Sequence, residues 1–178
     1  MKHAVTSLFT GCFLCVAAII GASAHEMEPD RIYNFHAVSE ELATAGQVFP
    51  EHIPLLQSRG VDMVVNLAVA DPERNGGEGL AVTSAGMSYV HIPVDWENPT
   101  KADLDLFFAV MDARAERNTV VHCFANYRAS AFTYLYRVLR EGVPEEEARA
   151  DLLAIWDDDA FEEYAHWRQF IDEALGAN

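Results

Sequence analysis

Short runs of β-branched and apolar residues alternate along this chain with segments of helical periodicity, and this alternation restricts its fold more than any other feature. The strand-like runs are 61–68, 87–94 and 119–122. The helical segments are 50–58, 100–117, 128–141, 145–156 and 161–175. Strands joined by helices predict an α/β domain with a central, partly parallel sheet flanked by helices, and the last segments predict a helical C-terminus.

Two local signals fix the ends of these helices. Thr100 and Asp103 have the spacing of a capping box, in which each residue bonds the backbone of the other at a helix start. Gly142 follows the segment 128–141 and predicts its end, because glycine adopts the left-handed conformation that terminates helices. Pro144 then opens the next helical segment.

The first residues have the pattern of an export signal. Residues 4–18 are almost free of charge, and the small residues Ala22-Ser23-Ala24 follow them. We therefore expect a cleaved signal peptide at 1–24 and one exported, periplasmic domain at 25–178. The apolar run is also about long enough for an uncleaved membrane anchor, which stays the alternative.

Charge excludes one broad class of function. The formal net charge is −16, with 28 acidic residues against 12 lysines and arginines. A surface this acidic repels nucleic acid and anionic membranes, so we exclude nucleic acid as a partner. The histidines are scattered without the spacing of metal ligands, and we expect neither a metal nor another cofactor. We expect a monomer.

Cysteine usage singles out one thiol. Cys12 and Cys15 lie inside the expected signal, so Cys123 remains alone and cannot form an intramolecular disulfide. A lone thiol in an oxidising compartment is either a buried apolar side chain or a functional group. Its neighbours have to decide between the two.

Those neighbours favour a nucleophile beside an anion site. In VVHCFANYRASAF, Cys123 ends a predicted strand, and Arg128 opens the following helix. A thiolate is a nucleophile, a helix N-terminus offers free N–H groups to an anion, and the guanidinium fork can bind two of its oxygens. The alternative is a buried thiol with an arginine that pairs with a surface carboxylate.

Here the sequence resembles a known superfamily. VVHCFANYRAS resembles the H-C-x5-R-S/T loop of cysteine-dependent protein tyrosine and dual-specificity phosphatases. AGQVFPEHIPLLQSRGVDMVVNL is similar to the opening of bacterial phosphatase-like domains, and HIPVDWENPTKADLDLFF resembles their general-acid loop and the helix after it. The resemblance spans about 32–141. It implies a tyrosine-phosphatase-like fold and the hydrolysis of phosphomonoesters, of the phosphotyrosine type or small phosphorylated molecules.

The resemblance also implies roles for particular residues. Cys123 would be the nucleophile that forms a phosphocysteine, Arg128 the phosphate clamp and Asp95 the general acid, with Asp71 as the rival acid. His122 would hold the loop by hydrogen bonding. The residues implied as substrate-binding are Phe124, Ala125, Asn126, Tyr127 and Ser130. For Ser130, a hydroxyl that stabilises the departing thiolate and a plain first-turn helix serine both stay open.

One departure from the family pattern bears directly on activity. Four residues separate Cys123 from Arg128, where the family has five, and the loop contains no glycine. Asn126 is the residue here that best tolerates a left-handed conformation. A one-residue shift on a helix rotates a side chain by about 100°. A catalytically impaired, phosphate-binding pseudophosphatase is therefore the first alternative.

Two further classes remain behind it. Rhodanese-like sulfurtransferases often carry a C-x4-R loop, which fits the spacing, but VVNLAVADPERNGG lacks the lead-in of those enzymes. A partner-docking module would use Trp156, Trp167 and Phe170 as an interface. Their helical spacing favours a place in the core instead.

Overall fold

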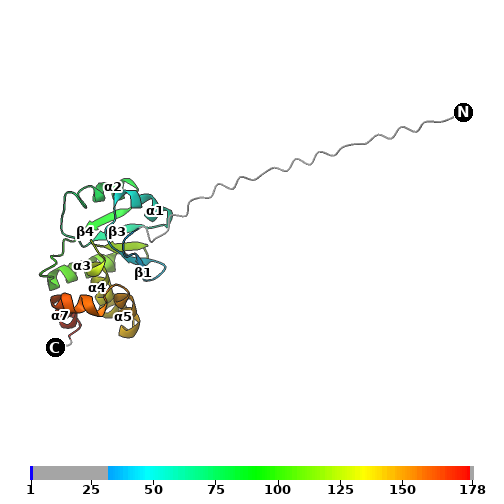
Figure 1. Ribbon diagram of the computed structural model, residues 1–178. Coiled ribbons are helices and arrows are strands. Elements are labelled where there is room, and N and C mark those ends of the chain that lie inside the picture. Colours follow the sequence, from blue (N-terminus) through cyan, green and yellow to red (C-terminus); the bar gives the residue numbers. More distant parts are fainter. Residues whose placement is uncertain (2–31, 177–178) are drawn as a thin grey trace.

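The computed structural model describes Met1 and residues 32–176 and has a five-stranded sheet at its centre (Figure 1). The strands are β1 (His36–Ala37), β2 (Leu42–Ala45), β3 (Met63–Asn66), β4 (Ser88–His91) and β5 (Thr119–His122). Their order across the sheet is β1-β2-β5-β3-β4. The β1–β2 pair is antiparallel and the other pairs are parallel, which confirms the predicted partly parallel sheet.

Helices connect the strands and then close the chain. They are α1 (Ile53–Ser58), α2 (Glu78–Ser84), α3 (Lys101–Ala113), α4 (Tyr127–Tyr136), α5 (Glu145–Leu153), α6 (Asp158–Glu163) and α7 (Ala165–Leu175). A 3-10 turn at Pro50–His52 leads into α1, and a π-helical segment at Arg137–Glu141 extends α4. The helical C-terminus is confirmed.

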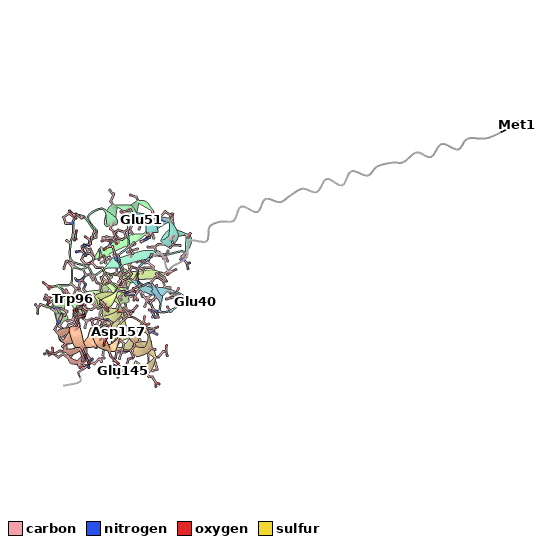
Figure 2. The ribbon with its side chains drawn as sticks, in the orientation of Figure 1. Met1, Glu40, Glu51, Trp96, Glu145 and Asp157 are labelled. Atoms are coloured by element: carbon pink, nitrogen blue, oxygen red, sulfur yellow. The ribbon has the colours of Figure 1, made fainter. Side chains whose placement is uncertain are left out.

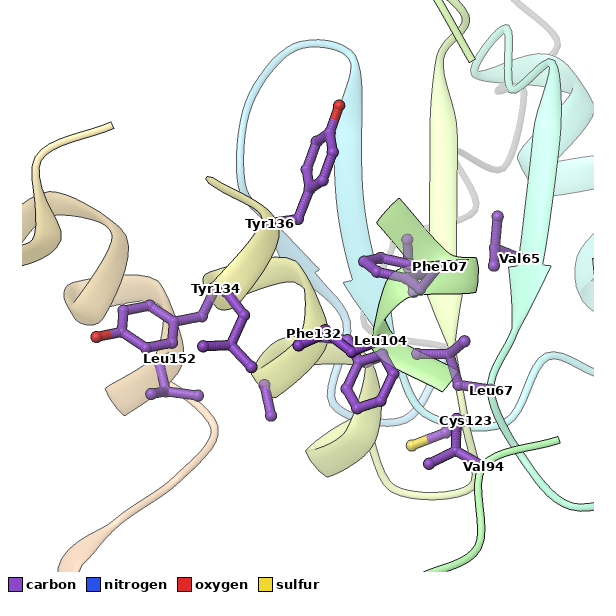
Figure 3. Packing of buried hydrophobic residues seen from close by; sticks show 14 of the residues in the cluster. Val65, Leu67, Val94, Leu104, Phe107, Cys123, Phe132, Tyr134, Tyr136 and Leu152 are labelled. Atoms are coloured by element: carbon purple, nitrogen blue, oxygen red, sulfur yellow. The ribbon is translucent and has the colours of Figure 1, made fainter. Parts of the chain in front are cut away.

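The sheet separates two apolar cores. Successive side chains of a strand point to opposite faces, so Val120 of β5 joins one cluster and Val121 the other. The smaller cluster packs under α1 and α2. The larger one lies against α3, α4 and the C-terminal helices and is rich in aromatic rings (Figures 1 and 3).

The predicted helix ends are found where the local signals place them. The hydroxyl of Thr100 accepts a hydrogen bond from the backbone of Asp103 at 3.2 Å, and the Asp103 carboxylate accepts one from the backbone of Thr100. Gly142 ends the π-helical extension of α4 with a φ of 70°. Both signals act through residues close in sequence, which is why they can be read without the fold.

One predicted element is wrong. The single helix expected at 161–175 is two helices, because Tyr164 leaves the helical region with φ −111° and ψ 53°. The ring of Tyr164 packs edge-on against Trp96, with 4.9 Å between centroids. Tertiary packing thus interrupts a segment whose apolar periodicity is continuous.

The expected signal peptide lies outside the described residues, and so does the predicted cleavage point after Ala24. Within the part of the chain that the structure describes, no helix is long and apolar enough to cross a membrane. The domain boundary at residue 25 and the export of the protein stay predictions.

Candidate active site

The candidate site begins where β5 ends. Strands β2, β5 and β3 are parallel, so their carboxyl ends meet at one edge of the sheet, where α/β folds bind ligands. Cys123 directly follows β5, and its backbone N–H donates to the carbonyl of Ala45 at 3.2 Å. Its side chain is buried at one end of the aromatic core, beside Val94 (Figure 3).

An asparagine makes the turn that glycine makes in related loops. Asn126 has a φ of 74°, in the left-handed region that asparagine tolerates better than most residues. Its amide donates to the carbonyl of Asn34 at 2.6 Å and to the hydroxyl of Thr44 at 3.0 Å. The Asn34 amide in turn donates to the carbonyl of Ala125 at 3.2 Å. These bonds fix the loop against the start of the domain.

The residues that follow β2 also contact the loop after Cys123. The backbone N–H of Gln47 donates to the carbonyl of Phe124 at 3.2 Å. A Cβ atom at Gly46 would lie 2.7 Å from the carbonyl oxygen of Tyr33 and 3.2 Å from that of Phe124. Glycine is therefore required at position 46 for the two segments to approach this closely.

Arg128 lies in the first turn of α4 and is 95% buried, at 5% exposure. Its Nη1 donates to the carbonyl of Val94 at 3.0 Å, and its guanidinium carbon lies 5.6 Å from the ring centroid of Trp96 and 5.4 Å from that of Phe124. Among residues 32–176 no carboxylate pairs with it, and its Nε has no hydrogen-bond partner. A buried cation without a counter-charge is costly unless an anion binds it.

Asp95 reaches the site from the chain beyond β4. Its side chain is exposed, and Oδ1 accepts a hydrogen bond from the backbone of Glu97 at 2.8 Å. The next residue, Trp96, is held by the C-terminal helices: His166 Nε2 and Trp167 Nε1 each lie 2.9 Å from its carbonyl oxygen. Figure 2 labels Trp96 at the side of the molecule, between the sheet and those helices.

These elements enclose an open pocket of about 430 Å³. Three residues predicted for catalysis, Cys123, Arg128 and Asp95, all line it. The structure therefore brings together side chains that are up to 33 positions apart, and the shorter loop does not remove the arginine from the pocket. Of the implied substrate-binding residues, Phe124, Ala125 and Tyr127 also line it.

Three pocket residues were missed by sequence reasoning: Val69, Trp96 and Tyr164. The centroids of Trp96, Tyr127 and Tyr164 lie within 6.0 Å of one another and form an aromatic wall. Trp96 could have been suspected from its place beside Asp95. Tyr164 could not, because it comes from a helix junction with no motif of its own.

Other predicted residues support the pocket without lining it. Asn126 uses its side chain to fix the loop, as described above. The Ser130 hydroxyl donates to the carbonyl of Asn126 at 2.8 Å and accepts from Trp156 Nε1 at 3.2 Å. These bonds match the helix-serine alternative. His122 is fully buried, and its Nε2 lies 2.6 Å from Oε1 of Glu78. Within residues 32–176 neither ring nitrogen makes a hydrogen bond of regular geometry, so the predicted hydrogen bond from His122 to the loop is not found.

Asp71, the rival acid, also lies outside the pocket lining. Its Oδ2 accepts from Arg74 Nε at 2.8 Å, and the hydrogen bonds from Arg74 lower the pKa of the Asp71 carboxyl. A carboxyl kept ionised is a poor proton donor. The guanidinium carbon of Arg74 lies 3.8 Å from the ring centroid of Phe124. The loop that carries Asp71 therefore packs on residues 123–127, here called the cysteine loop.

The fold and this arrangement define a class. A nucleophilic residue type at the end of a central parallel strand, followed by an arginine at a helix start and faced by an acidic loop, is the plan of tyrosine-phosphatase-like proteins. The family model "Beta-lactamase hydrolase-like protein, phosphatase-like domain" matches residues 34–139. The chain belongs to this family.

Solved structures agree with the assignment. A candidate phosphatase (DUF442) from Shewanella putrefaciens CN-32 is 36% identical, with a TM-score of 0.73 over 82% of this chain and 91% of that one. P. aeruginosa TpbA is 19% identical, with a TM-score of 0.63 over 83% and 91% of the two chains. Tk-PTP is 16% identical, with a TM-score of 0.63 over 81% and 97%. The last two show the fold alone. The comparison with curated proteins gave no match.

These findings confirm the predicted superfamily and the class of phosphoric monoester hydrolase. They do not address the role of any single residue, and those roles are proposed below. Within residues 32–176 no three histidine, cysteine, aspartate or glutamate side chains converge as metal ligands would. Metal-free chemistry stays a prediction.

Proposed function

We propose that this protein is a cysteine-dependent phosphatase that hydrolyses phosphomonoesters through a phosphocysteine intermediate. One observation carries the proposal above the others: the buried guanidinium of Arg128 has no carboxylate partner among the described residues and lines the same pocket as Cys123. A phosphate dianion supplies the missing counter-charge and accepts the fork of donors. The N–H groups at the start of α4 add to that binding.

In the first step the Cys123 thiolate attacks phosphorus and the bond from phosphorus to the ester oxygen breaks. Asp95, from the exposed acid loop at the pocket, gives its proton to that leaving oxygen. Arg128 binds the equatorial oxygens as their charge develops. The products of the step are the free alcohol or phenol and a phosphocysteine.

In the second step water attacks the phosphorus of the phosphocysteine. The Asp95 carboxylate takes a proton from that water, and the sulfur–phosphorus bond breaks to release phosphate and the thiolate. Asn126 keeps the loop in the conformation that presents its backbone to the anion. Ser130 holds the far end of the loop through the carbonyl of Asn126, and His122, which precedes Cys123, lies in close contact with Glu78.

The pocket walls favour an aromatic phosphate. Trp96, Tyr127 and Tyr164 offer ring surface to a phenyl group, which is worth more than contact area alone when the rings meet edge to face. TpbA, which shares the fold, has been crystallised in complex with pTyr. We infer that the substrate is of the phosphotyrosine type. We also infer that the protein acts in the periplasm, after cleavage of its signal near Ala24.

The proposal is tested by hydrolysis of an aryl phosphate and a phosphotyrosine peptide between pH 5 and 8. Turnover by the wild type that disappears in Cys123→Ser, by a factor of about 10⁴ or more, is the expected result. Tungstate that raises the melting temperature without any turnover would contradict it and indicate a phosphate-binding pseudophosphatase.

The same samples test the remaining class. A sulfurtransferase would form thiocyanate from thiosulfate and cyanide, and this activity would also require Cys123. We expect none, because the acid loop carrying Asp95 and the matched family are those of phosphatases. Thiocyanate formation without phosphate release would replace the proposed function.

A further inference from the structure

A buried carboxylate lies behind the cysteine loop, on the face of the sheet opposite Cys123. Glu78 is the first residue of α2 and is 2% exposed. Its Oε1 lies 2.6 Å from His122 Nε2, a close polar contact without the angles of a regular hydrogen bond. Its Oε2 accepts hydrogen bonds from Asn66 at 3.1 Å and from Gln47 at 3.4 Å. No motif in the sequence draws attention to this residue, and the proposed chemistry does not use it.

The three partners of Glu78 come from three neighbouring strand ends. In the sheet register, His122 of β5 is opposite Asn66 of β3 on one side and Ala45 of β2 on the other. Gln47 follows β2 by two residues. One carboxylate thus joins the ends of the three strands at the edge of the sheet where the pocket lies.

Each of these strand ends leads directly into a wall of the pocket. His122 is joined to Cys123. The backbone of Gln47 donates to the carbonyl of Phe124 at 3.2 Å. The side-chain oxygen of Asn66 accepts from the backbone of Ala68 at 2.7 Å, one residue before Val69.

Simple packing does not account for an acid at this place. Burying a carboxyl group is unfavourable unless hydrogen bonds or a cation compensate it, and an apolar side chain at position 78 would avoid that cost. The carboxylate of Glu78 also acts on Tyr89, which lies in β4. Burial, and then the charge of Glu78, raise the pKa of Tyr89 to about 12 while a hydrogen bond from Asn66 opposes them. The contacts of Glu78 to three strand ends are the feature that sets this buried carboxylate apart from a simple packing residue.

We propose that Glu78 is a positioning residue of the phosphatase site: its carboxylate fixes the His122 ring and, through it, the place of Cys123 relative to Arg128 and Asp95. The inference rests on the proposed function, since it concerns the rate of that reaction. Glu78 does not touch the substrate, because it lies on the other face of the sheet and outside the pocket lining.

The test is Glu78→Gln, which keeps the shape of the side chain and removes its charge. We expect kcat to fall by about ten- to a hundredfold with KM changed less than about twofold, because a small displacement of the reacting groups slows the chemical step more than it weakens binding. Glu147→Gln is the matched control, because Glu147 is an exposed acid paired with Arg137 away from the pocket. Its kinetics should equal those of the wild type. An unchanged kcat in folded Glu78→Gln overturns the inference.

A double-mutant cycle separates positioning through His122 from a general loss of structure. If Glu78 acts through His122, Glu78→Gln together with His122→Gln lowers kcat no further than His122→Gln alone. If the two losses multiply, Glu78 does not act through His122 and the inference is wrong. The free energy of unfolding of all four proteins is measured beside the rates.

Two further measurements apply if Glu78→Gln does not fold or if the wild type shows no turnover. If Glu78→Gln does not fold, Gln47→Met removes one arm of the network at nearly constant length and should lower kcat about threefold. An unchanged kcat there contradicts the proposal. If the wild type hydrolyses no phosphomonoester, the proposed function fails first. The affinity for vanadate, which bonds to the thiolate in the geometry of the transition state, then decides on Glu78: about tenfold weaker binding is expected in Glu78→Gln, and equal binding overturns its role.

Discussion

Two tryptophans of the C-terminal helical region hold the two loops of the pocket, and they do so in unequal circumstances. Trp156 and Trp167 are both fully buried. The indole N–H of Trp156 donates to the carbonyl of Tyr127, at the end of the cysteine loop, at 3.1 Å. That of Trp167 donates to the carbonyl of Trp96, in the acid loop, at 2.9 Å.

The cysteine loop is held by several other residues, whereas the acid loop, which carries Asp95 and Trp96, is held by the C-terminal helix α7. Asn34, Gly46 and Gln47 all contact the cysteine loop, and all lie inside the segment that matches the family. The carbonyl of Trp96 is held by His166 and Trp167, which lie beyond residue 139, where the match ends. We infer that anion binding depends mainly on residues inside the matched segment, while placement of the acid depends on helices that lie beyond it.

Among the changes that compare the two loops, the largest effect should come from removing the acid itself. Asp95→Asn should lower kcat by about 10²- to 10⁴-fold on alkyl phosphates, whose leaving oxygen needs a proton. The loss should be much smaller on a nitrophenyl phosphate, whose leaving group departs without one. Rates on the two esters give the measurement. An equal loss on both would mean that Asp95 does not act as the acid.

A second change addresses the cysteine loop. Arg128→Lys keeps the charge but not the planar fork, and should lower kcat/KM by about 10²-fold while weakening tungstate binding. Arg140→Lys is the matched control. Arg140 also lies over an aromatic ring, that of Phe108, but is exposed and remote from the pocket. If Arg128→Lys retains full activity, the clamp is another group.

The tryptophan pair gives the sharpest form of the comparison. Trp167→Phe removes one hydrogen bond, and Trp156→Phe removes a donor that the carbonyl of Tyr127 and the hydroxyl of Ser130 share. Either loss is worth about 1 kcal/mol, and most of the ring packing stays. Trp167→Phe should lower kcat about three- to tenfold and leave tungstate affinity unchanged. Trp156→Phe should leave kcat nearly unchanged and weaken tungstate binding by a smaller factor, because other residues also hold the cysteine loop. Identical kinetic changes in the two variants would contradict the division of labour between them.

The smallest effect is expected at Asp71. Asp71→Asn should change kcat less than about twofold, since this side chain lies outside the pocket lining and its lowered pKa keeps it ionised. A carboxyl whose pKa is lower in the folded state contributes stability at pH values above its unfolded pKa of about 3.9. This contribution is lost as the pH falls through the folded pKa. The variant should therefore melt slightly below the wild type at pH 7, and the difference should shrink as the pH falls below the unfolded pKa. A large loss of activity would restore Asp71 as the acid.

Sequence alone determined what depends on near neighbours. The β-branched runs, the Thr100–Asp103 capping box and Gly142 act over one or two turns, so they could be read directly. Cys123, Arg128 and the tolerance of Asn126 for a left-handed turn belong to one short loop, and the resemblance added Asp95. Those residues do meet in the structure, apart from Asn126, which shapes the loop instead.

Tertiary structure decided the rest, because the partners are far apart in the chain. Nothing local links Trp167 to Trp96, or Glu78 to His122, since these pairs are separated by 71 and 44 positions. The break at Tyr164 depends on a ring that it meets only in the folded protein. Whether the shorter loop still presents Arg128 to the pocket was likewise set by backbone conformation, through the turn at Asn126 and its bonds to the start of the domain.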